Sequence, residues 1–348
     1  MTRSIMTLYK GFLLIILLLI YADINAQQAA KTGNPILEDW YADPEMVILG
    51  NTYWLFPTSS GISSDRIALD AFSSNDLVSW KKHEAIISSK NVDWIDDSLW
   101  APSAIEKDGK YFVFFSANDI QTPESKWWNP KKHDSTEVGG IGVAVAKNPR
   151  GPYKDLLGKP LIGKVHNKAQ PIDQFVFKDI DGTYYMIYGG WNHCNIAKLN
   201  TDFTGFIAFE NGQYFKEITP KDYVEGPFMF VKNDKYYFMW SEGSWGKDNY
   251  SVAYAIADSP LGPFERLDTV LQSDPQIATG AGHHSILNIP NTDDWYMIYH
   301  RRPIPNEHRN HRVVCIDKME FNTDGTIKPI KMTFEGVGTV PLNSAKKK

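Results

Sequence analysis

The sequence predicts an all-β fold, a five-bladed β-propeller, and three observations support this prediction. A hairpin-like stretch recurs five times along the chain, four short β-like segments fit into each repeat, and amphipathic helical periodicity is almost absent. The steps between the first aromatic residues after each hairpin turn are 58, 73, 52 and 59 positions. These residues are Tyr53, Tyr111, Tyr184, Tyr236 and Trp295. A β-sandwich would also contain many short strands, but it would not repeat five times.

Each repeat opens with an apolar run, a turn rich in Gly, Asp or Asn, and an aromatic strand, which is the pattern of a β-hairpin. The five hairpins span residues 41–58, 100–117, 171–190, 224–243 and 282–302. Further β-like sequence follows them at 71–83, 142–153, 195–206, 251–264 and 312–325. Asp108-Gly109 and Asp181-Gly182 are the clearest turn dipeptides. Segment 118–140 lengthens the second repeat, and inserted loops often shape binding sites, so Trp127 and Trp128 are binding candidates.

The first 26 residues have the pattern of a secretory signal peptide. Arg3 and Lys10 precede the apolar run 12–20, and Ala26 offers a small residue for cleavage. This run is much shorter than the roughly 20 residues that span a bilayer, so a retained anchor is the weaker alternative. The sequence therefore predicts a periplasmic or secreted protein without a membrane anchor after cleavage, with one propeller domain over 34–340.

Charge and cysteine content exclude two classes of protein. The formal net charge of the chain is −5, whereas a nucleic-acid-binding protein needs a basic face. The two cysteines, Cys194 and Cys315, rule out a disulfide-dense scaffold. They leave open one bridge or two buried thiols. We expect a monomer.

Carboxylates occupy matching positions in three repeats. Asp43, Asp173 and Glu225 lie 10 or 11 residues before the aromatic residue that follows each turn, and His283 and His284 lie at the comparable place in the fifth repeat. Because the first strand of each blade lines the central channel, these side chains should converge on one pocket. Turn formation would explain any one acid but explains three in register poorly. A separated acid and base are what glycoside hydrolysis needs, and acids on blades one and four favour the wider spacing of an inverting enzyme. Glu106 and Glu242 are interpreted as solvated or turn residues.

The chain resembles family 43 of the glycoside hydrolases over about residues 34–340. The resemblance is carried by YADPEMV, WAPSAIEKDGKYFVFFSA, PIDQFVFKDIDGTYYMIYGG, EGPFMF and GHHSI, in this order and spacing. Family members are five-bladed propellers that act on arabinose- and xylose-containing plant polysaccharides. The resemblance implies an inverting mechanism in which Asp43 is the general base, Glu225 is the general acid, and Asp173 orients the acid and raises its pKa.

The resemblance also implies a cation in the channel, held by the blade-five His. It points to His283, with His284 as the fallback, and a hard ion such as Ca²⁺ suits one imidazole and water better than Zn²⁺ does. A channel His that is hydrogen-bonded without a metal is the alternative. No organic cofactor is expected.

Substrate contacts are predicted from aromatic and cationic residues near the pocket register. Trp100 could stack on a sugar face, and Arg301 and Arg302 could donate to sugar hydroxyls or a carboxylate, with one of the two expected to face solvent. Trp40 and Trp245 are further candidates, with core or rim packing as the alternative.

The predicted function is that of an exported inverting glycoside hydrolase, an α-L-arabinofuranosidase acting on plant cell-wall oligo- or polysaccharides. A β-xylosidase and an endo-arabinanase are the alternatives within the class. A noncatalytic carbohydrate-binding propeller is the alternative from another class.

Overall fold

The computed structural model describes residues 33–61, 67–95, 98–117 and 140–342. The predicted signal peptide at 1–26 and the candidates Trp127 and Trp128 lie outside these residues. Within the described ranges no helix is long and apolar enough to cross a membrane.

The described residues form five antiparallel sheets, one for each predicted repeat. Blade one contains β1 (Tyr41–Leu49), β2 (Thr52–Ser59), β3 (Ala68–Ser74) and β4 (Lys81–Ser88). Blade two contains β5 (Leu99–Lys107), β6 (Lys110–Ala117), β7 (Gly140–Ala146) and β8 (Lys154–Asp155). Blade three contains β9 (Phe175–Lys178), β10 (Tyr184–Tyr188), β11 (Asn195–Leu199), β12 (Phe206–Ile207) and β13 (Lys216–Glu217). Blade four contains β14 (Glu225–Lys232), β15 (Lys235–Glu242), β16 (Ser251–Ala257) and β17 (Asp268–Leu271). Blade five contains β18 (Ala278–Asn288), β19 (Trp295–Pro303) and β20 (Val313–Met319).

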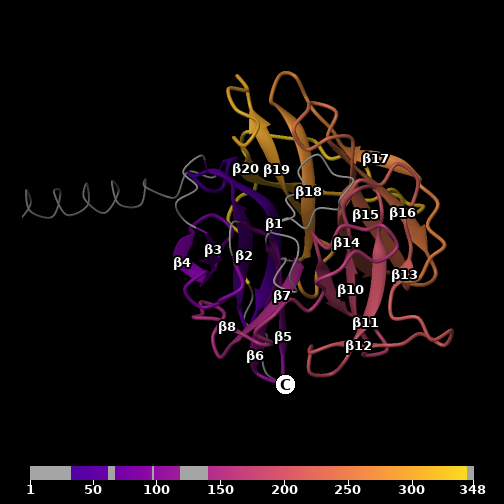
Figure 1. The fold of residues 1–348 in the computed structure, drawn as a ribbon. Helices are drawn as coiled ribbons and strands as arrows, with labels where there is room; N and C mark the ends of the chain where they lie inside the picture. Colours follow the sequence, from indigo (N-terminus) through magenta and orange to yellow (C-terminus); the bar gives the residue numbers. More distant parts are fainter. Residues whose placement is uncertain (1–32, 62–66, 96–97, 118–139, 343–348) are drawn as a thin grey trace, which may run out of the picture.

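The five sheets form a closed ring, which confirms the predicted five-bladed β-propeller. Around Figure 1 the blades follow in chain order, with β1–β4 at the left, β5–β8 at the bottom, β10–β12 at the lower right, β14–β17 at the right and β18–β20 at the top. The first strands contact one another in the cycle β1, β5, β9, β14, β18 and back to β1. They therefore line the centre, as the repeat predicts.

The chain itself closes the ring at blade five, which has only three strands. Residues 34–36 lie along the outer edge of β20, where the Ile36 amide donates to the Val314 carbonyl at 2.9 Å and the Ile316 amide donates to Asn34 Oδ1 at 2.8 Å. Further along, the Val340 amide donates to the Asp76 carbonyl of blade one at 2.9 Å. Segments from both ends of the described chain thus join blade five to blade one.

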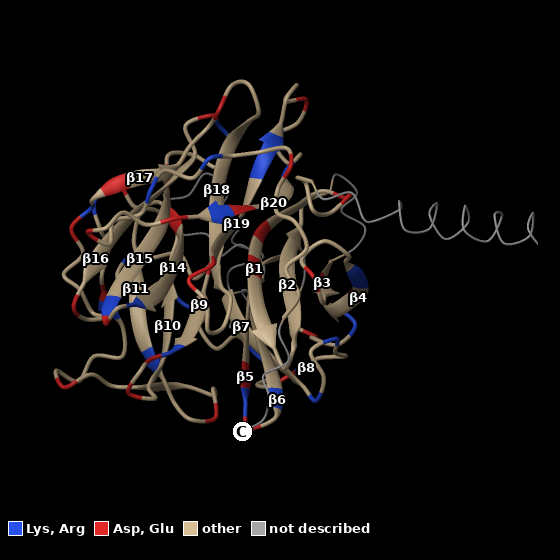
Figure 2. Cartoon of the chain, turned by 180° about the vertical axis from the view of Figure 1, so that it is seen from behind, with Lys and Arg blue, Asp and Glu red and all other residues tan. Residues whose placement is uncertain are grey.

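Aromatic side chains fill the core between blades. Trp240, Tyr53, Tyr153 and Tyr188 are among the largest fully buried residues, and burial of one such side chain contributes on the order of 1.5–3 kcal/mol. Cys194 and Cys315 are buried and free, so the open question about them resolves as two thiols. Charged residues of both signs are interspersed over the side that Figure 2 shows.

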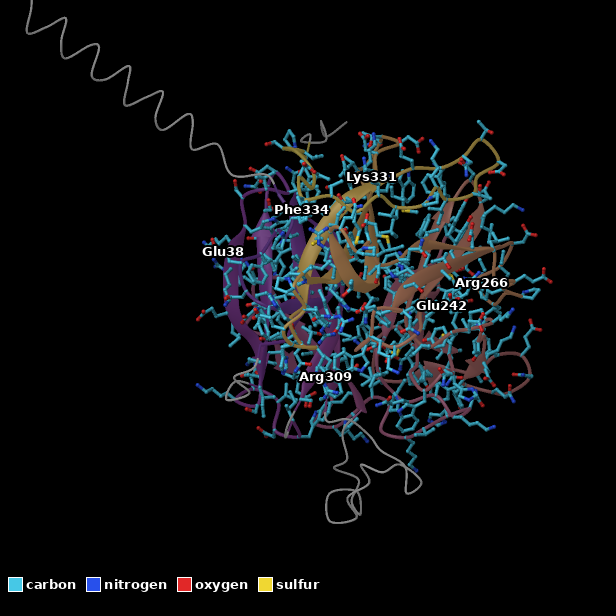
Figure 3. The ribbon with its side chains drawn as sticks, turned by 90° about the horizontal axis from the view of Figure 1, so that it is seen from above. Glu38, Glu242, Arg266, Arg309, Lys331 and Phe334 are labelled. Atoms are coloured by element: carbon cyan, nitrogen blue, oxygen red, sulfur yellow. The ribbon has the colours of Figure 1, made fainter. Side chains whose placement is uncertain are left out.

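The two acids interpreted as solvated or turn residues have different environments. Glu106 is exposed, as predicted. The prediction for Glu242 is wrong, because its side chain is buried and accepts from Arg266 Nε at 2.7 Å and Nη2 at 2.9 Å. Figure 3 shows this pair side by side. A bidentate guanidinium contact offsets the desolvation of a buried carboxylate.

Candidate active site

An irregularity recurs near the start of every blade's first strand. The pairing register shifts there in β1, β5, β14 and β18, and each blade has a residue with a positive φ at this point. These residues are Asp43 (47°), Ala101 (43°), Asp173 (55°), Gly226 (62°) and His283 (34°). For residues other than glycine this backbone costs about 1–3 kcal/mol and persists only where the surroundings enforce it. By this backbone feature, Gly226 is the blade-four residue that corresponds to Asp43, Ala101, Asp173 and His283 in the other blades. Glu225 lies one position before it.

Hydrogen bonds between blades hold four of these residues in place. In each case the backbone amide donates to a second-strand side chain of the preceding blade. The pairs are Ala101 to Thr58 Oγ1 at 2.7 Å, Asp173 to Ser116 Oγ at 3.0 Å, His283 to Ser241 Oγ at 2.9 Å, and Asp43 to His300 Nδ1 at 3.2 Å. Each blade thus fixes the start of the next blade's inner strand.

The fifth amide, that of Gly226, has a different partner. The preceding blade has Gly189 at the position of Ser116 and Ser241, five residues after the aromatic that follows the turn. A Cβ at Gly189 would lie 2.1 Å from the His193 carbonyl oxygen, so no side chain fits there. The Gly226 amide donates instead to Asp173 Oδ2 at 3.2 Å. This bond directs the Asp173 carboxylate toward the residue next to Glu225.

Asp43 lies buried among three cationic or cationisable groups. Its Oδ1 is 3.1 Å from Arg312 Nη1, 3.4 Å from His283 Nδ1 and 3.3 Å from His300 Nδ1. Burial alone would raise the pKa of Asp43, but the charge of Arg312, followed by His283 and His300, outweighs it and holds the pKa well below its usual range. Asp43 is therefore ionised, in the form that can orient a water molecule and accept its proton.

The second carboxylate group consists of Asp173 and Glu225. Burial raises the pKa of Asp173 well above its usual range, and the charges of Glu225 and then Asp43 raise it further. Neighbouring carboxylates resist double ionisation, so the pair retains a proton toward neutral pH. Glu225 Oε1 accepts a hydrogen bond from the Tyr250 hydroxyl at 2.9 Å. Burial raises the pKa of Tyr250 well above its usual value, which keeps this hydroxyl a donor.

Asp43 and Asp173 line a cavity of about 20 Å³, enough for about one water molecule or ion. Its lining includes Glu45 and His284. Burial raises the pKa of Glu45 to about 8, although the Ala104 amide and the Ser103 hydroxyl donate to it. The floor of the site is therefore polar but carries little charge at neutral pH.

The two blade-five histidines differ in their partners. His283 Nδ1 lies 3.4 Å from oxygens of both Asp43 and Asp173. Neither ring nitrogen of the buried His284 has a hydrogen-bond partner, and burial lowers its pKa to about 3, so the ring is neutral. In the described part of the chain no group of three or more His, Cys, Asp or Glu could hold a metal. A cation here would have one imidazole and water as ligands, which His284 fits; His283 as a metal ligand stays a prediction.

Trp100, a predicted substrate residue, lies in the register of the carboxylates. Trp100 directly precedes Ala101 and pairs with Ser116, so it occupies in blade two the position of Glu225 in blade four. It is half-buried, and its contact with sugar stays a prediction.

Arg301 and Arg302 are both held by protein groups outside the carboxylate cluster. Arg301 Nη1 donates to the Thr333 carbonyl at 2.8 Å. Arg302 donates to the Gly246 carbonyl at 2.8 Å and to Asp248 Oδ1 at 3.0 Å. The expectation that one of them faces solvent is wrong, because both are 2% exposed. A role of either one in substrate binding stays a prediction.

Sequence reasoning missed Arg312, which directly precedes β20. This residue contacts Asp43 Oδ1, and its Cζ lies 5.2 Å from the centre of the Trp245 ring. It also missed Tyr250, Ser116 and His300. Ser116 and His300 share one place in the repeat, five residues after the aromatic that follows the turn, so the repeat could have marked them. No comparable sequence signal marks Arg312 or Tyr250.

The comparisons with known proteins agree with this geometry. Residues 32–327 match the profile of the Glycosyl hydrolases family 43. The chain is 39% identical over 322 residues to beta-D-galactofuranosidase xynD of Aspergillus niger, which covers 88% of this chain and 87% of that protein. It is 28% identical over 276 residues to a beta-xylosidase of Xylanibacter ruminicola, with 70% and 77% covered.

A solved thermostable family-43 glycoside hydrolase has the same fold. It superposes with a TM-score of 0.71 at 23% identity, covering 90% of this chain and 99% of that one. With the profile spanning most of the chain and a relative at 39% identity, the chain belongs to glycosyl hydrolase family 43.

Proposed function

We propose that this protein is an exported, inverting α-L-arabinofuranosidase that acts on plant cell-wall oligo- or polysaccharides. One observation carries the proposal: an ionised carboxylate and a proton-retaining carboxylate pair, supplied by different blades, meet at the head of one channel. Inverting hydrolysis needs an ionised carboxylate as its base and a protonated carboxyl group as its acid.

The mechanism assigns one role to each carboxylate. Asp43 accepts a proton from a water molecule while the water oxygen attacks the anomeric carbon on one face of the sugar. The bond from that carbon to the leaving oxygen breaks on the opposite face, and Glu225 donates its proton to this oxygen. Asp173, through its bond to the Gly226 amide, holds the acid's strand and favours a proton in the pair.

The sugar specificity is proposed from ring chemistry. The relative at 39% identity is named for β-D-galactofuranoside, whose five-membered ring has the configuration of an α-L-arabinofuranoside with an additional side-chain carbon. A β-D-galactofuranosidase is therefore the second candidate function. The β-xylosidase relative supports a six-membered-ring pentoside as a third substrate, and endo-arabinanase action remains the alternative on polymers.

The channel cation remains part of the proposal, as a Ca²⁺ ion held by a blade-five histidine. The unpartnered nitrogens of His284 favour it as the ligand over His283. Such an ion would add positive charge to the cavity that His284 lines. If EDTA and His284→Ala each leave both the thermal midpoint and the activity unchanged, the proposed ion is ruled out.

The proposal is tested on purified protein with nitrophenyl α-L-arabinofuranoside, β-D-galactofuranoside and β-D-xyloside, and with arabinan and arabinoxylan. We expect the arabinofuranoside to have the highest kcat/KM, with the first product of inverted anomeric configuration by proton NMR. Binding of these sugars without turnover would establish the noncatalytic propeller instead. Export is tested by the N-terminal residue of the protein recovered from outside the cytoplasm, which we expect to follow Ala26.

The acid is tested by Glu225→Gln, which keeps the shape of the side chain and removes the proton donor. We expect kcat/KM on arabino-oligosaccharides to fall about 10²–10⁴-fold, the usual contribution of acid catalysis. The loss should be much smaller on nitrophenyl glycosides, because a good leaving group needs little protonation. Equal losses on both substrate types would assign the proton donor to another residue.

A further inference from the structure

The loop between β19 and β20, residues 304–312, frames the mouth of the site. On one side His311 stacks on Trp40, with ring centres 4.2 Å apart and planes at 16°. On the other side Arg309 and Arg312 lie over Trp245, with Cζ atoms 5.0 and 5.2 Å from the ring centre. Trp40 directly precedes the strand that carries Asp43, and Trp245 follows β15, the partner strand of Glu225. The loop therefore spans the base and acid blades.

The two arginines of this loop have different roles. Arg312 is used by the site itself, since its Nη1 lies 3.1 Å from Asp43 Oδ1 and its side chain is 13% exposed. Arg309 is exposed, and among the described residues it forms no ion pair with a carboxylate. In Figure 3 Arg309 is well separated from Phe334, over which Arg301 lies, so the arginines of this blade serve different places.

Arg309 is also held in place rather than free. Stacking on an indole restricts a side chain that otherwise loses about 2 kcal/mol of rotamer entropy when it binds a ligand. An ordered guanidinium presents paired N–H donors whose geometry matches a carboxylate. It lies over the same Trp245 ring as Arg312, whose Nη1 is 3.1 Å from Asp43 Oδ1, and is therefore close to the carboxylate cluster.

We propose that Arg309, fixed on Trp245, binds the carboxylate of a uronic acid residue in the substrate, next to the pentose that is removed. This inference rests on the proposed function and narrows its substrate to acidic glycans. The neighbouring charges are Arg312, which is paired with Asp43, and Glu307, which is exposed on the same loop. Arg302 is paired with Asp248. Among the described residues, Arg309 is thus the arginine of this loop that no carboxylate pairs with, so its charge can bind an anionic ligand.

The experiment compares two oligosaccharides that differ only in one group. Both carry the same terminal arabinofuranose; one has a uronate beside it, and the other has that carboxyl group reduced to the alcohol. We expect wild-type kcat/KM to be about tenfold higher for the acidic oligosaccharide, the size of one charge-assisted hydrogen bond. The preference should shrink as salt is raised, because the contact is at the surface.

The variants are Arg309→Gln and, as a matched control, Arg150→Gln. Arg150 is an exposed arginine on the turn after β7. Its variant therefore changes the net charge by the same amount as Arg309→Gln, but at the outer part of a blade. We expect the acidic preference to fall to about one in Arg309→Gln and to persist in Arg150→Gln. A wild-type ratio of one, or an unchanged ratio in Arg309→Gln, overturns the inference.

Failure of the proposed function has a separate signature. If neither oligosaccharide nor nitrophenyl arabinofuranoside is hydrolysed, the proposed activity is wrong. Calorimetric titration with the uronate oligosaccharide lacking the pentose, and with its reduced form, then decides the inference by itself. Binding of the acidic form that is weakened about tenfold in Arg309→Gln supports it, and equal binding of both forms overturns it.

Discussion

At the scale of single residues, the site depends on opposite electrostatic environments for its carboxylates. Asp43 and Asp173 are both buried, and burial raises the pKa of either one. The charge of Arg312 is the largest effect that lowers the pKa of Asp43. For Asp173, the neighbouring carboxylates raise the pKa further. One buried Asp therefore stays ionised and the other belongs to a pair that keeps a proton, which is the division of roles that acid and base catalysis need.

Arg312→Gln tests this division through the pH dependence of the rate. Loss of the guanidinium raises the pKa of Asp43 toward or above its usual range, because the burial penalty is no longer opposed by the largest charge. A base works only when deprotonated, so the acid limb of kcat/KM should move up by about 1–3 pH units. The measurement is a pH profile on nitrophenyl arabinofuranoside, with Arg150→Gln as the control. An acid limb that stays in place would show that Arg312 does not set the ionisation of Asp43.

The residues found by sequence and those missed differ in a physical way. Asp43, Asp173 and Glu225 could be found because the repeat fixes their place along each first strand. Arg312 could not, because its contact joins residues 269 positions apart. Arg301 and Arg302 do lie on opposite faces of β19, as alternation requires, but both faces of this middle strand are covered by protein.

At the scale of strands, the hydrogen bonds of the backbone amides at the register shifts explain how a sequence difference between blades changes the environment of a site carboxylate. Three blades have Thr58, Ser116 or Ser241 at the same place of the second strand, and each accepts one amide of the next blade. Blade three has Gly189 there, and the Asp173 carboxylate takes over the contact. The missing side chain thus ties Asp173, the proposed orienting acid, to the strand of Glu225. The sequence shows that residue 189 is a glycine. It does not show that the amide left without an acceptor there bonds the Asp173 carboxylate.

Ser116→Ala and Thr58→Val separate structural from catalytic effects of these bonds. Each removes the acceptor of one buried amide, so each should lower the free energy of unfolding by about 1–3 kcal/mol in urea titrations. Ser116 positions Asp173, whereas Thr58 positions Ala101. Only Ser116→Ala should therefore shift the basic limb of the pH profile, because only it disturbs the Asp173–Glu225 pair. Identical pH profiles for the two variants would mean that the Ser116 bond supports the fold alone.

At the scale of the whole molecule, the site exists only when the ring is closed. Asp43, Asp173 and Glu225 come from blades one, three and four, and the adjoining histidines come from blade five. The repeats predicted five blades, but they did not predict how the last blade is completed. That depends on residues 34–36, whose pairing with β20 joins positions more than 270 apart in sequence.

Asn34→Ala tests this closure. Asn34 Oδ1 accepts from the Ile316 amide at 2.8 Å, and Nδ2 donates to the Ile316 carbonyl and to Asp317 Oδ2, each at 3.1 Å. Removing the side chain leaves these groups buried without that partner, at a cost of about 1–3 kcal/mol for each group that stays unsatisfied. We therefore expect the urea midpoint to fall clearly, while activity at 25 °C in buffer remains.

The control for this variant is Asn288→Ala, in which the lost amide bonds only the turn between β18 and β19. This change should cost no more than about 1 kcal/mol, as is usual for surface turns. Because closure assembles the site, loss of activity in urea should coincide with loss of tryptophan fluorescence in both variants, at a lower urea concentration for Asn34→Ala. Equal midpoints for the two variants would show that residues 34–36 follow the edge of blade five without stabilising the ring.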